Sequence, residues 1–328
     1  MALKTVQLNL YIYEGTSGSY TGTDLKYTIQ NSIIGTDTNV VFEIAELVRD
    51  YLDITFNNDY LSKTIWVTTV ATLLDENNNV FTYGSPEINT YLATDGYGYF
   101  EDSANPELSR NLLITSNSMS LPKDVAGKLP IFAEGVGKVI IDSTTTQITD
   151  SGNSNQKIQY LTIPANTSTV KIYDTDDSTL LRTVSVTNVC EPKFTPYKVT
   201  FTNKYGAYQD LYFFKKTVEA FNVTDEKYKR NTIKNSTATY NKYSAQEERY
   251  NTNATKSITL NTGFINEDNN ATIEELFLSE NIWIRYGADT LPILPKTKTL
   301  TFKTSLNDKL ANYTVEFNFA FNKINNVR

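Results

Sequence analysis

Carboxylates are the side chains of this sequence that could carry chemistry, because it contains no histidine. Asp174, Asp176 and Asp177 crowd oxygen ligands into one short polar segment, and calcium prefers six to eight oxygens. The segment lacks the glycine and the distal glutamate of an EF-hand loop. A solvated turn is the alternative interpretation, and we expect no bound metal.

Adjacent acids offer a second kind of chemistry. Glycoside hydrolysis needs two carboxyl groups facing each other across a cleft and no histidine. Glu274 with Glu275, or Glu247 with Glu248, are the candidate pairs. Neighbouring acids more often mark the start of a helix or a solvated face. Spacing along the sequence does not tell whether either pair faces across a cleft. We therefore keep a glycosidase as an alternative function, and we predict no catalytic residue.

The missing residue types exclude several classes of site. Without histidine, this chain has no Ser-His-Asp triad, no Cys-His pair and no imidazole ligand for a metal. A single cysteine, Cys190, excludes an internal disulfide, a cysteine-ligated zinc and an iron–sulfur cluster. No neighbouring cluster of Lys and Arg lowers its pKa, so we expect Cys190 to be a small buried residue. The chain is therefore predicted to be non-enzymatic and to need no cofactor.

Aromatic residues are the candidates for recognition, since the chain holds 22 tyrosines and 16 phenylalanines. Their rings offer a large rigid area at low entropic cost and so anchor interfaces. In β-proteins, however, aromatics also pair across strands and fill cores. For the series Tyr205, Tyr208, Tyr212 and Phe214 both interpretations are open. The tyrosines that we predict to lie in an interface are Tyr97, Tyr99, Tyr205, Tyr208, Tyr240 and Tyr243.

Charge and hydropathy exclude further partners. The chain carries 30 basic and 37 acidic residues, a net charge of −7 at pH 7, whereas a protein that coats nucleic acid needs an excess of basic residues. We therefore expect no free nucleic acid as a partner. No segment approaches the roughly 18–20 apolar residues of a membrane-spanning helix. The N-terminal segment lacks the apolar core of a signal peptide, so we expect synthesis in a cytoplasm and no membrane span.

The dominant local pattern is the period-two alternation of β-strands. In residues 5–13, Val6, Leu8, Leu10 and Ile12 share one face, and polar residues share the other. The same alternation, or a run of β-branched residues, predicts further strands at 25–29, 33–34, 64–74, 80–83, 112–115, 128–133, 138–141, 159–163, 170–173, 181–186, 197–214 (strand, turn, strand), 217–224, 255–261, 281–287, 297–304 and 312–322. Residues 291–295 contain two prolines, which predicts an edge strand.

Helical signals occur at two places. Apolar residues in 42–52 recur at helical spacing, which predicts a short helix. Thr272-x-x-Glu275 is a capping box and predicts the start of a second short helix.

These elements predict a mainly β fold with two or three β-sandwich or β-barrel-like domains, two short helices and long polar loops. We expect an N-terminal β domain with one short helix (1–110), a β-sandwich-like domain (111–190) and a C-terminal mainly β domain with one short helix (191–328). Residues 84–110 are predicted to form a long surface loop, and residues 225–254 an exposed excursion or strand extension. Both are our candidates for contact with a partner, and we expect them to become ordered only in an assembly.

Residues 193–216, Lys-Phe-Thr-Pro-Tyr-Lys-Val-Thr-Phe-Thr-Asn-Lys-Tyr-Gly-Ala-Tyr-Gln-Asp-Leu-Tyr-Phe-Phe-Lys-Lys, resemble a virion structural protein of tailed bacteriophages of Bacteroidota hosts, crAss-like phages included. The closing run at 303–317 adds to this resemblance, which covers mainly residues 190–328. It implies a neck, tail or baseplate component that assembles with copies of itself in a ring and with other virion proteins. It also implies a location in the virion, after synthesis in the host cytoplasm, and offers no site residues.

A carbohydrate- or receptor-binding tail adhesin is the alternative function. It would use Tyr97, Tyr99 or Trp283 as platforms on which sugars stack. Binding of the isolated chain to a glycan array distinguishes the adhesin from the building block.

Overall fold

The computed structural model describes residues 3–34, 39–81, 86–102, 111–191, 193–234, 236–299, 301 and 310–324. The fold is mainly β, with 49% strand and 9% helix, which confirms the predicted fold class. Among the described residues the sheets form no closed barrel. The same residues contain no helix that is long and apolar enough to cross a membrane.

The chain divides into two compact units. Unit 1 consists of Met1–Cys190, Thr200–Leu211 and Asp268–Asn281. Unit 2 consists of Glu191–Val199, Tyr212–Glu267 and Ile282–Arg328.

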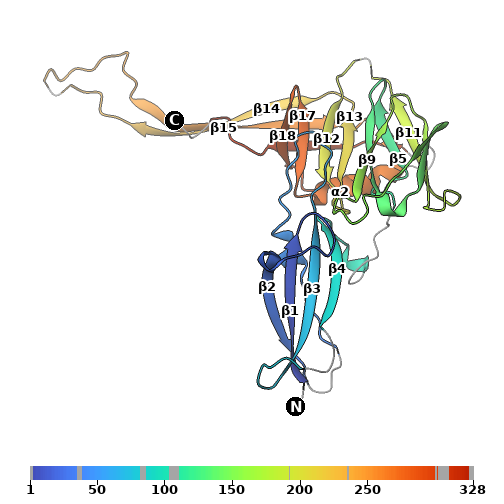
Figure 1. The fold of residues 1–328 in the computed structure, drawn as a ribbon. Helices are drawn as coiled ribbons and strands as arrows, with labels where there is room; N and C mark the ends of the chain where they lie inside the picture. The colour runs from blue at the N-terminus through green and yellow to red at the C-terminus, as the bar shows by residue number, and fades with distance from the viewer. Residues whose placement is uncertain are drawn as a thin grey trace. The chain divides into compact units, whose positions relative to one another are not determined.

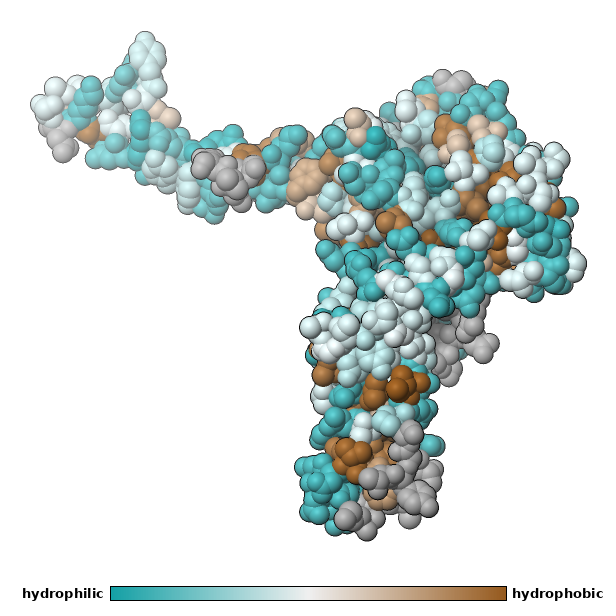
Figure 2. Space-filling model, viewed as in Figure 1, coloured by the Kyte–Doolittle hydropathy of each residue, from teal (hydrophilic) through white to brown (hydrophobic). Residues whose placement is uncertain are grey.

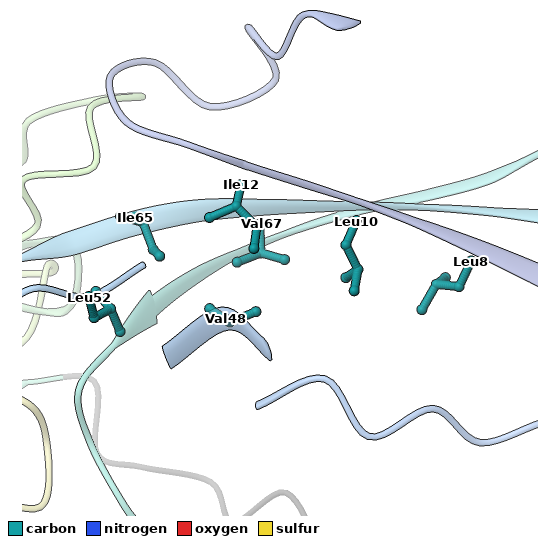
Figure 3. Packing of buried hydrophobic residues seen from close by; sticks show 7 residues of the cluster. All are labelled: Leu8, Leu10, Ile12, Val48, Leu52, Ile65 and Val67. Carbon is teal, nitrogen blue, oxygen red and sulfur yellow. The ribbon is translucent and has the colours of Figure 1, made fainter. Parts of the chain in front are cut away.

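Unit 1 begins with a four-stranded antiparallel sheet of order β2-β1-β3-β4 (Figure 1). Its strands are β1 (Leu3–Tyr13), β2 (Leu25–Ser32), β3 (Thr64–Asp75) and β4 (Glu87–Thr94), with the 3-10 turn η1 (Gly22–Asp24) before β2. The alternation of β1 places Leu8, Leu10 and Ile12 on one face. These side chains point toward Val48 of the short helix α1 (Ala45–Arg49), which covers that face (Figure 3).

Unit 1 continues with a five-stranded and a two-stranded sheet. The order β5-β11-β10-β7-β8 describes the first, and β6 pairs with β9 in the second. Val139, Val170, Ile172 and Val184 are fully buried in the five-stranded sheet. The strands of these two sheets are β5 (Ser118–Pro122), β6 (Gly127–Phe132), β7 (Lys138–Ile141), β8 (Thr144–Gln147), β9 (Ile158–Ile163), β10 (Thr169–Tyr173) and β11 (Leu180–Val189). Unit 1 also contains the 3-10 turns η2 (Phe100–Asp102) and η3 (Ala133–Gly135).

A seven-stranded sheet of order β13-β12-β17-β18-β20-β15-β14 supplies most of the strands of unit 2. Phe317 is fully buried, and its ring meets that of Phe213 edge to face at 6.1 Å. The strands are β12 (Tyr197–Thr202), β13 (Tyr208–Phe213), β14 (Val218–Lys229), β15 (Glu247–Asn261), β17 (Ile282–Tyr286), β18 (Asp289–Pro295) and β20 (Thr314–Phe319). The remaining elements are β16 (Ile265–Asn266), β19 (Leu310–Ala311), η4 (Glu267–Asn269) and the helix α2 (Asn270–Leu278) of unit 1.

Most predicted strands are confirmed, but residues 112–115 form none. Leu112 makes only an isolated bridge with Ile131. The guanidinium of Arg182 donates to the carbonyls of Ile114 (2.7 Å) and Thr115 (2.9 Å), so a side chain takes the acceptors that a neighbouring strand would use. Residues 33–34 also lie outside the strands. In the segment 297–304, residues 297–299 and 301 are not strand, and the others lie outside the described residues.

The partner strand predicted for β3 at 80–83 is present only at its start among the described residues. Val80 bridges Leu74 and the Phe81 amide donates to the carbonyl of Leu73 at 2.8 Å, while residues 82–83 lie outside the described residues. The long antiparallel partners of β3 are β1 and β4, and β4 lies in the segment predicted to be a long loop. In β4 the apolar residues Ile88 and Leu92 alternate with polar ones, a signal hidden by the surrounding Gly-, Tyr- and acid-rich sequence.

Two further predictions, the edge position of residues 291–295 and the start of the second helix, are wrong for local reasons. β18 is an interior strand rather than an edge, because its neighbour β20 uses the carbonyl of Pro292, which accepts from the Ala320 amide at 3.0 Å. The second helix is confirmed, but it begins at Asn270 and not at a Thr272 cap. Thr272 and Glu275 are instead buried inside α2, where the Thr272 hydroxyl accepts from the Gln209 amide at 3.3 Å.

One close backbone approach fixes the end of β4 in unit 1. Gly206 has φ +74°, and a Cβ there would lie 2.7 Å from the Cβ of Thr94. A Cβ at Gly96 would lie 2.6 Å from the carbonyl oxygen of Lys204, which accepts from the Tyr97 amide at 2.9 Å. Only glycine at positions 96 and 206 permits this close approach of the two backbone segments. The approach holds the start of residues 95–100 against residues 204–206.

Gly206→Ala should therefore destabilise the fold by about 2–4 kcal/mol, the sum of a strained positive φ and an overpacked contact. The matched control is Gly152→Ala, which has φ +63° but no atom within 4 Å of the added Cβ. It should cost about 1 kcal/mol from backbone strain alone. Denaturant unfolding of both variants measures the difference, and equal losses would contradict the steric role of Gly206.

Candidate functional site

Strands β14 and β15 continue as a two-stranded ribbon past the third strand of their sheet (Figure 1). β20 pairs with β15 only from Ser257 to Asn261, whereas β14 stays paired with β15 out to Lys229 and Glu247. We call residues 221–256 the arm. At about 3.3 Å per residue, the stretch of β14 from Phe221 to Lys229 spans about 30 Å.

The arm is exposed on both faces. Every residue of β14 is exposed, although side chains alternate between the two faces of a strand. Figure 2 shows the arm as predominantly hydrophilic with isolated apolar residues. β14 also ends its sheet, so one row of its backbone groups faces no neighbouring strand. An isolated two-stranded ribbon is only marginally stable in water, and its open edge can pair with another strand.

Side-chain contacts across the arm are those of a solvated ribbon. Arg249 pairs with Asp225 at 2.7 Å, and the rings of Tyr228 and Tyr250 meet edge to face at 5.7 Å. Glu248 pairs with Arg230 and accepts a hydrogen bond from the Tyr228 hydroxyl. Exposed ion pairs contribute about 0–1 kcal/mol each. The arm therefore takes little stability from its own contacts.

The base of the arm is tied to unit 2 by a charged cluster and by the Lys323 amide, which donates to the carbonyl of Ala254 at 2.8 Å. The ammonium of Lys256 lies 2.7 Å from both the Glu219 carboxylate and the Tyr286 hydroxyl, and that hydroxyl donates to Glu219 at 2.7 Å. The same ammonium lies over the rings of Tyr286 and Phe319, 4.5 and 5.5 Å from their centroids. Burial opposes the ionised forms, but hydrogen bonds and charge outweigh it, so the pKa of Glu219 is lowered and that of Lys256 is raised.

Neutralising this cluster should loosen the arm without unfolding the sheet. Because the pKa of Glu219 lies below its ordinary value of 4.5, its contribution is complete above that value and is lost as pH falls through the lowered pKa. Glu219→Gln should speed amide exchange in the arm about 2- to 5-fold at neutral pH, as the loss of about 0.5–1 kcal/mol implies, and should remove the acid-dependent step. Glu247→Gln, at an exposed position on β15, is the control and should change neither.

The end of the arm has a composition unlike the rest of the chain. Residues 227–246, the tip, contain five Lys or Arg and no Asp or Glu. Among the described residues, none of Lys227, Lys234 and Lys242 forms an ion pair. Tyr240 and Tyr243 of the tip are 64% and 96% exposed. Segments 225–229 and 247–254 are therefore a strand extension, one of the two forms predicted. The tip combines exposed rings with a positive charge of which only Arg230 has an ion pair among the described residues.

The predicted interface tyrosines separate into three groups. Tyr240 and Tyr243 are exposed on the tip. Tyr205 and Tyr208 are buried in unit 1, where the Tyr208 hydroxyl donates to the carbonyl of Thr55 at 2.9 Å. Their rings are buried, as are those of Tyr212 and Phe214, because β13 is covered on both faces and all of its residues except Asp210 are buried. Of the two interpretations of this series, the structure therefore favours core packing.

Tyr97 and Tyr99, the remaining pair, are half-buried beside a groove in unit 1. The groove has a volume of about 930 Å³ and lies between α1, the end of β4, residues 95–100 and residues 278–280. Burial, followed by the nearby charge of Glu275, raises the pKa of Tyr99 to about 12, so this ring stays neutral. Apolar side chains from these elements line the groove: Ile44, Val48, Leu52, Val67, Leu92 and Leu278.

Acidic residues surround this apolar groove. Glu46, Asp95 and Glu280 line it together with one cation, Arg49. The guanidinium of Arg49 pairs with Asp95 at 3.1 Å and with Glu280, which joins α1 to the segments after β4 and α2. Further acids, Glu43, Asp50, Glu101 and Asp102, lie next to the lining residues in sequence. The groove therefore presents an apolar floor with net negative charge.

The other candidate groups have structural partners. Asp176 accepts hydrogen bonds from the backbone and hydroxyl groups of Ser178 and Thr179, which lower its pKa, as in a solvated turn. Nowhere in the described part of the chain do three His, Cys, Asp or Glu side chains gather in a way that could hold a metal. Burial raises the pKa of Glu275, whose carboxylate accepts a hydrogen bond from Thr115.

Two burial predictions are wrong. Cys190 is exposed, because it lies just beyond β11 at the end of a strand rather than within a core. Trp283, a possible sugar platform, is 8% exposed and lies in β17, an interior strand of the seven-stranded sheet.

No family model matches this chain, and neither the curated proteins nor the solved structures give a match. The functional argument therefore depends on the arm and on the groove themselves.

Proposed function

We propose that this chain is a structural component of a tailed phage virion, which assembles into a ring or a part of the neck, tail or baseplate through protein–protein contacts. The observation that supports this function is the arm, a ribbon about 30 Å long that is exposed on both faces and has an open edge. The resemblance carried by residues 193–216 and 303–317 is the reason for proposing a phage virion in particular.

The arm suits assembly for a physical reason. A long ribbon that gains little from its own chain can gain burial and backbone hydrogen bonds from a neighbour. A subunit that extends one element onto the next copy uses two different surfaces, and such head-to-tail contacts close into a ring when the rotation allows. Other virion proteins are the further partners in this proposal, and the virion is its location.

Shortening the arm tests this function. Thr224 and Asn253 are paired, so replacing residues 225–252 by Asn-Gly would close the ribbon with a two-residue turn and keep the base cluster. The full chain should form multimers by light scattering, with rings in electron micrographs, and the shortened chain should keep the mass of a single subunit. Unfolding measurements establish that its sheets are intact.

The matched control is Thr145→Lys on β8, another fully exposed edge strand, which should leave assembly unchanged. A full chain that stays single at high concentration, or a shortened chain that assembles equally well, would contradict the proposed function. Glycan-array binding by a single full-length chain would favour the adhesin instead.

A further inference from the structure

We propose that the basic tip of one copy docks into the acidic-rimmed groove of unit 1 of a second copy. This inference depends on the proposed function and names the two surfaces that meet. It commits to one occupant of the groove, residues 227–246 of a neighbouring chain.

Charge segregation along the chain is the first observation. The chain carries −7 overall, and the tip carries +5. All other residues together therefore carry −12, so the negative charge of the chain lies outside the tip. Lys227, Lys234 and Lys242 are exposed and, among the described residues, form no ion pair. A surface of opposite sign both attracts and orients such a segment.

The groove matches the tip in charge and in polarity. Its lining holds three acids and one arginine, a net charge of −2, and the arginine is already engaged by two of those acids. Its volume of about 930 Å³ lies at the upper end of the roughly 300–1,000 Å³ typical of binding pockets. Several ring-sized side chains fit a space of that size, and Tyr240, Tyr243 and Ile233 of the tip are exposed.

A nucleic acid would also attract a basic, tyrosine-bearing segment. A nucleic acid bound to the tip would, however, leave the apolar lining of the groove uncovered. The groove of a second copy offers acids to the lysines of the tip and apolar side chains to its rings. The tip and the groove are different surfaces of one chain, so each copy can give its tip to one neighbour and receive a tip from another.

A charge-swap pair tests this contact directly. The tip variant is Lys227→Glu/Lys234→Glu/Lys242→Glu, and the groove variant is Glu46→Lys/Glu101→Lys. Glu46 lines the groove, Glu101 follows the lining residue Phe100 in sequence, and neither is paired with Arg49. The tip variant changes the net charge of the tip from +5 to −1, and Glu46→Lys in the groove variant changes that of the lining from −2 to 0. Each variant alone therefore loses the attraction between its own tip and groove, so its self-association, measured by light scattering, should weaken at least 10-fold. In an equimolar mixture the unchanged tip of the groove variant can dock into the unchanged groove of the tip variant, so association should exceed that of either variant alone.

Matched controls reverse exposed charges elsewhere. Lys171→Glu on β10 and Glu76→Lys in the turn after β3 should leave self-association unchanged, alone and when mixed. A mixture no better than the single variants, while shortening the arm still abolishes assembly, would overturn the groove as the docking site and leave the proposed function standing. Loss of binding to a DNA duplex in the tip variant, with self-association unchanged, would overturn it in favour of nucleic acid.

Discussion

A strand pair that lies outside any core must draw its stability from something other than burial, and this constraint governs the arm. Its cross-strand contacts are exposed ion pairs and ring contacts, each of small value. Near its base it is held in unit 2 by the cluster in which Lys256 joins Glu219 to Tyr286, and by the Lys323 amide, which donates to the carbonyl of Ala254. A ribbon that is anchored at one end and solvated beyond its base is suited to reach a partner.

The same division between anchored base and solvated end explains the composition of the chain. The sheets take their apolar residues from strands such as β1 and β20, which alternate cleanly and pack on one face. The arm has no core to serve, so its strands are built from polar and charged residues and its tip can hold a positive charge. In the proposed contact between copies, the opposite signs of the tip and the groove attract each other at short range.

The sequence predicted those strands whose burial is one-sided. β1, with Val6, Leu8, Leu10 and Ile12 alternating, was found with nearly its full length, because one-sided burial leaves a period-two signal. The outer part of the arm and β8 leave no such signal, since both of their faces are exposed. The role of Arg182, which occupies the carbonyls of residues 114 and 115, depends on a contact far away in sequence and so lies outside what a local pattern can indicate.

The candidate site was predictable only in part. The exposure of Tyr240 and Tyr243 could be predicted from their polar surroundings, but Tyr205 and Tyr208 are the same residue type and are buried, one in the turn before β13 and one at the start of that strand. The groove needs α1, β4 and residues 278–280 together, and no spacing in the sequence brings these segments to one place. The absence of acids from residues 227–246, by contrast, is visible in the sequence and was the signal that could have found the tip.

Hydrogen exchange along the arm tests the central claim most directly, because it reports whether these strands gain a partner. Amides of residues 221–229 and 247–256 should exchange quickly in the single chain and at least about 10-fold more slowly in the multimer, since a new neighbour stabilises the ribbon. Equal exchange in the two states, or strong protection already in the single chain, would show that the arm serves its own subunit and not assembly.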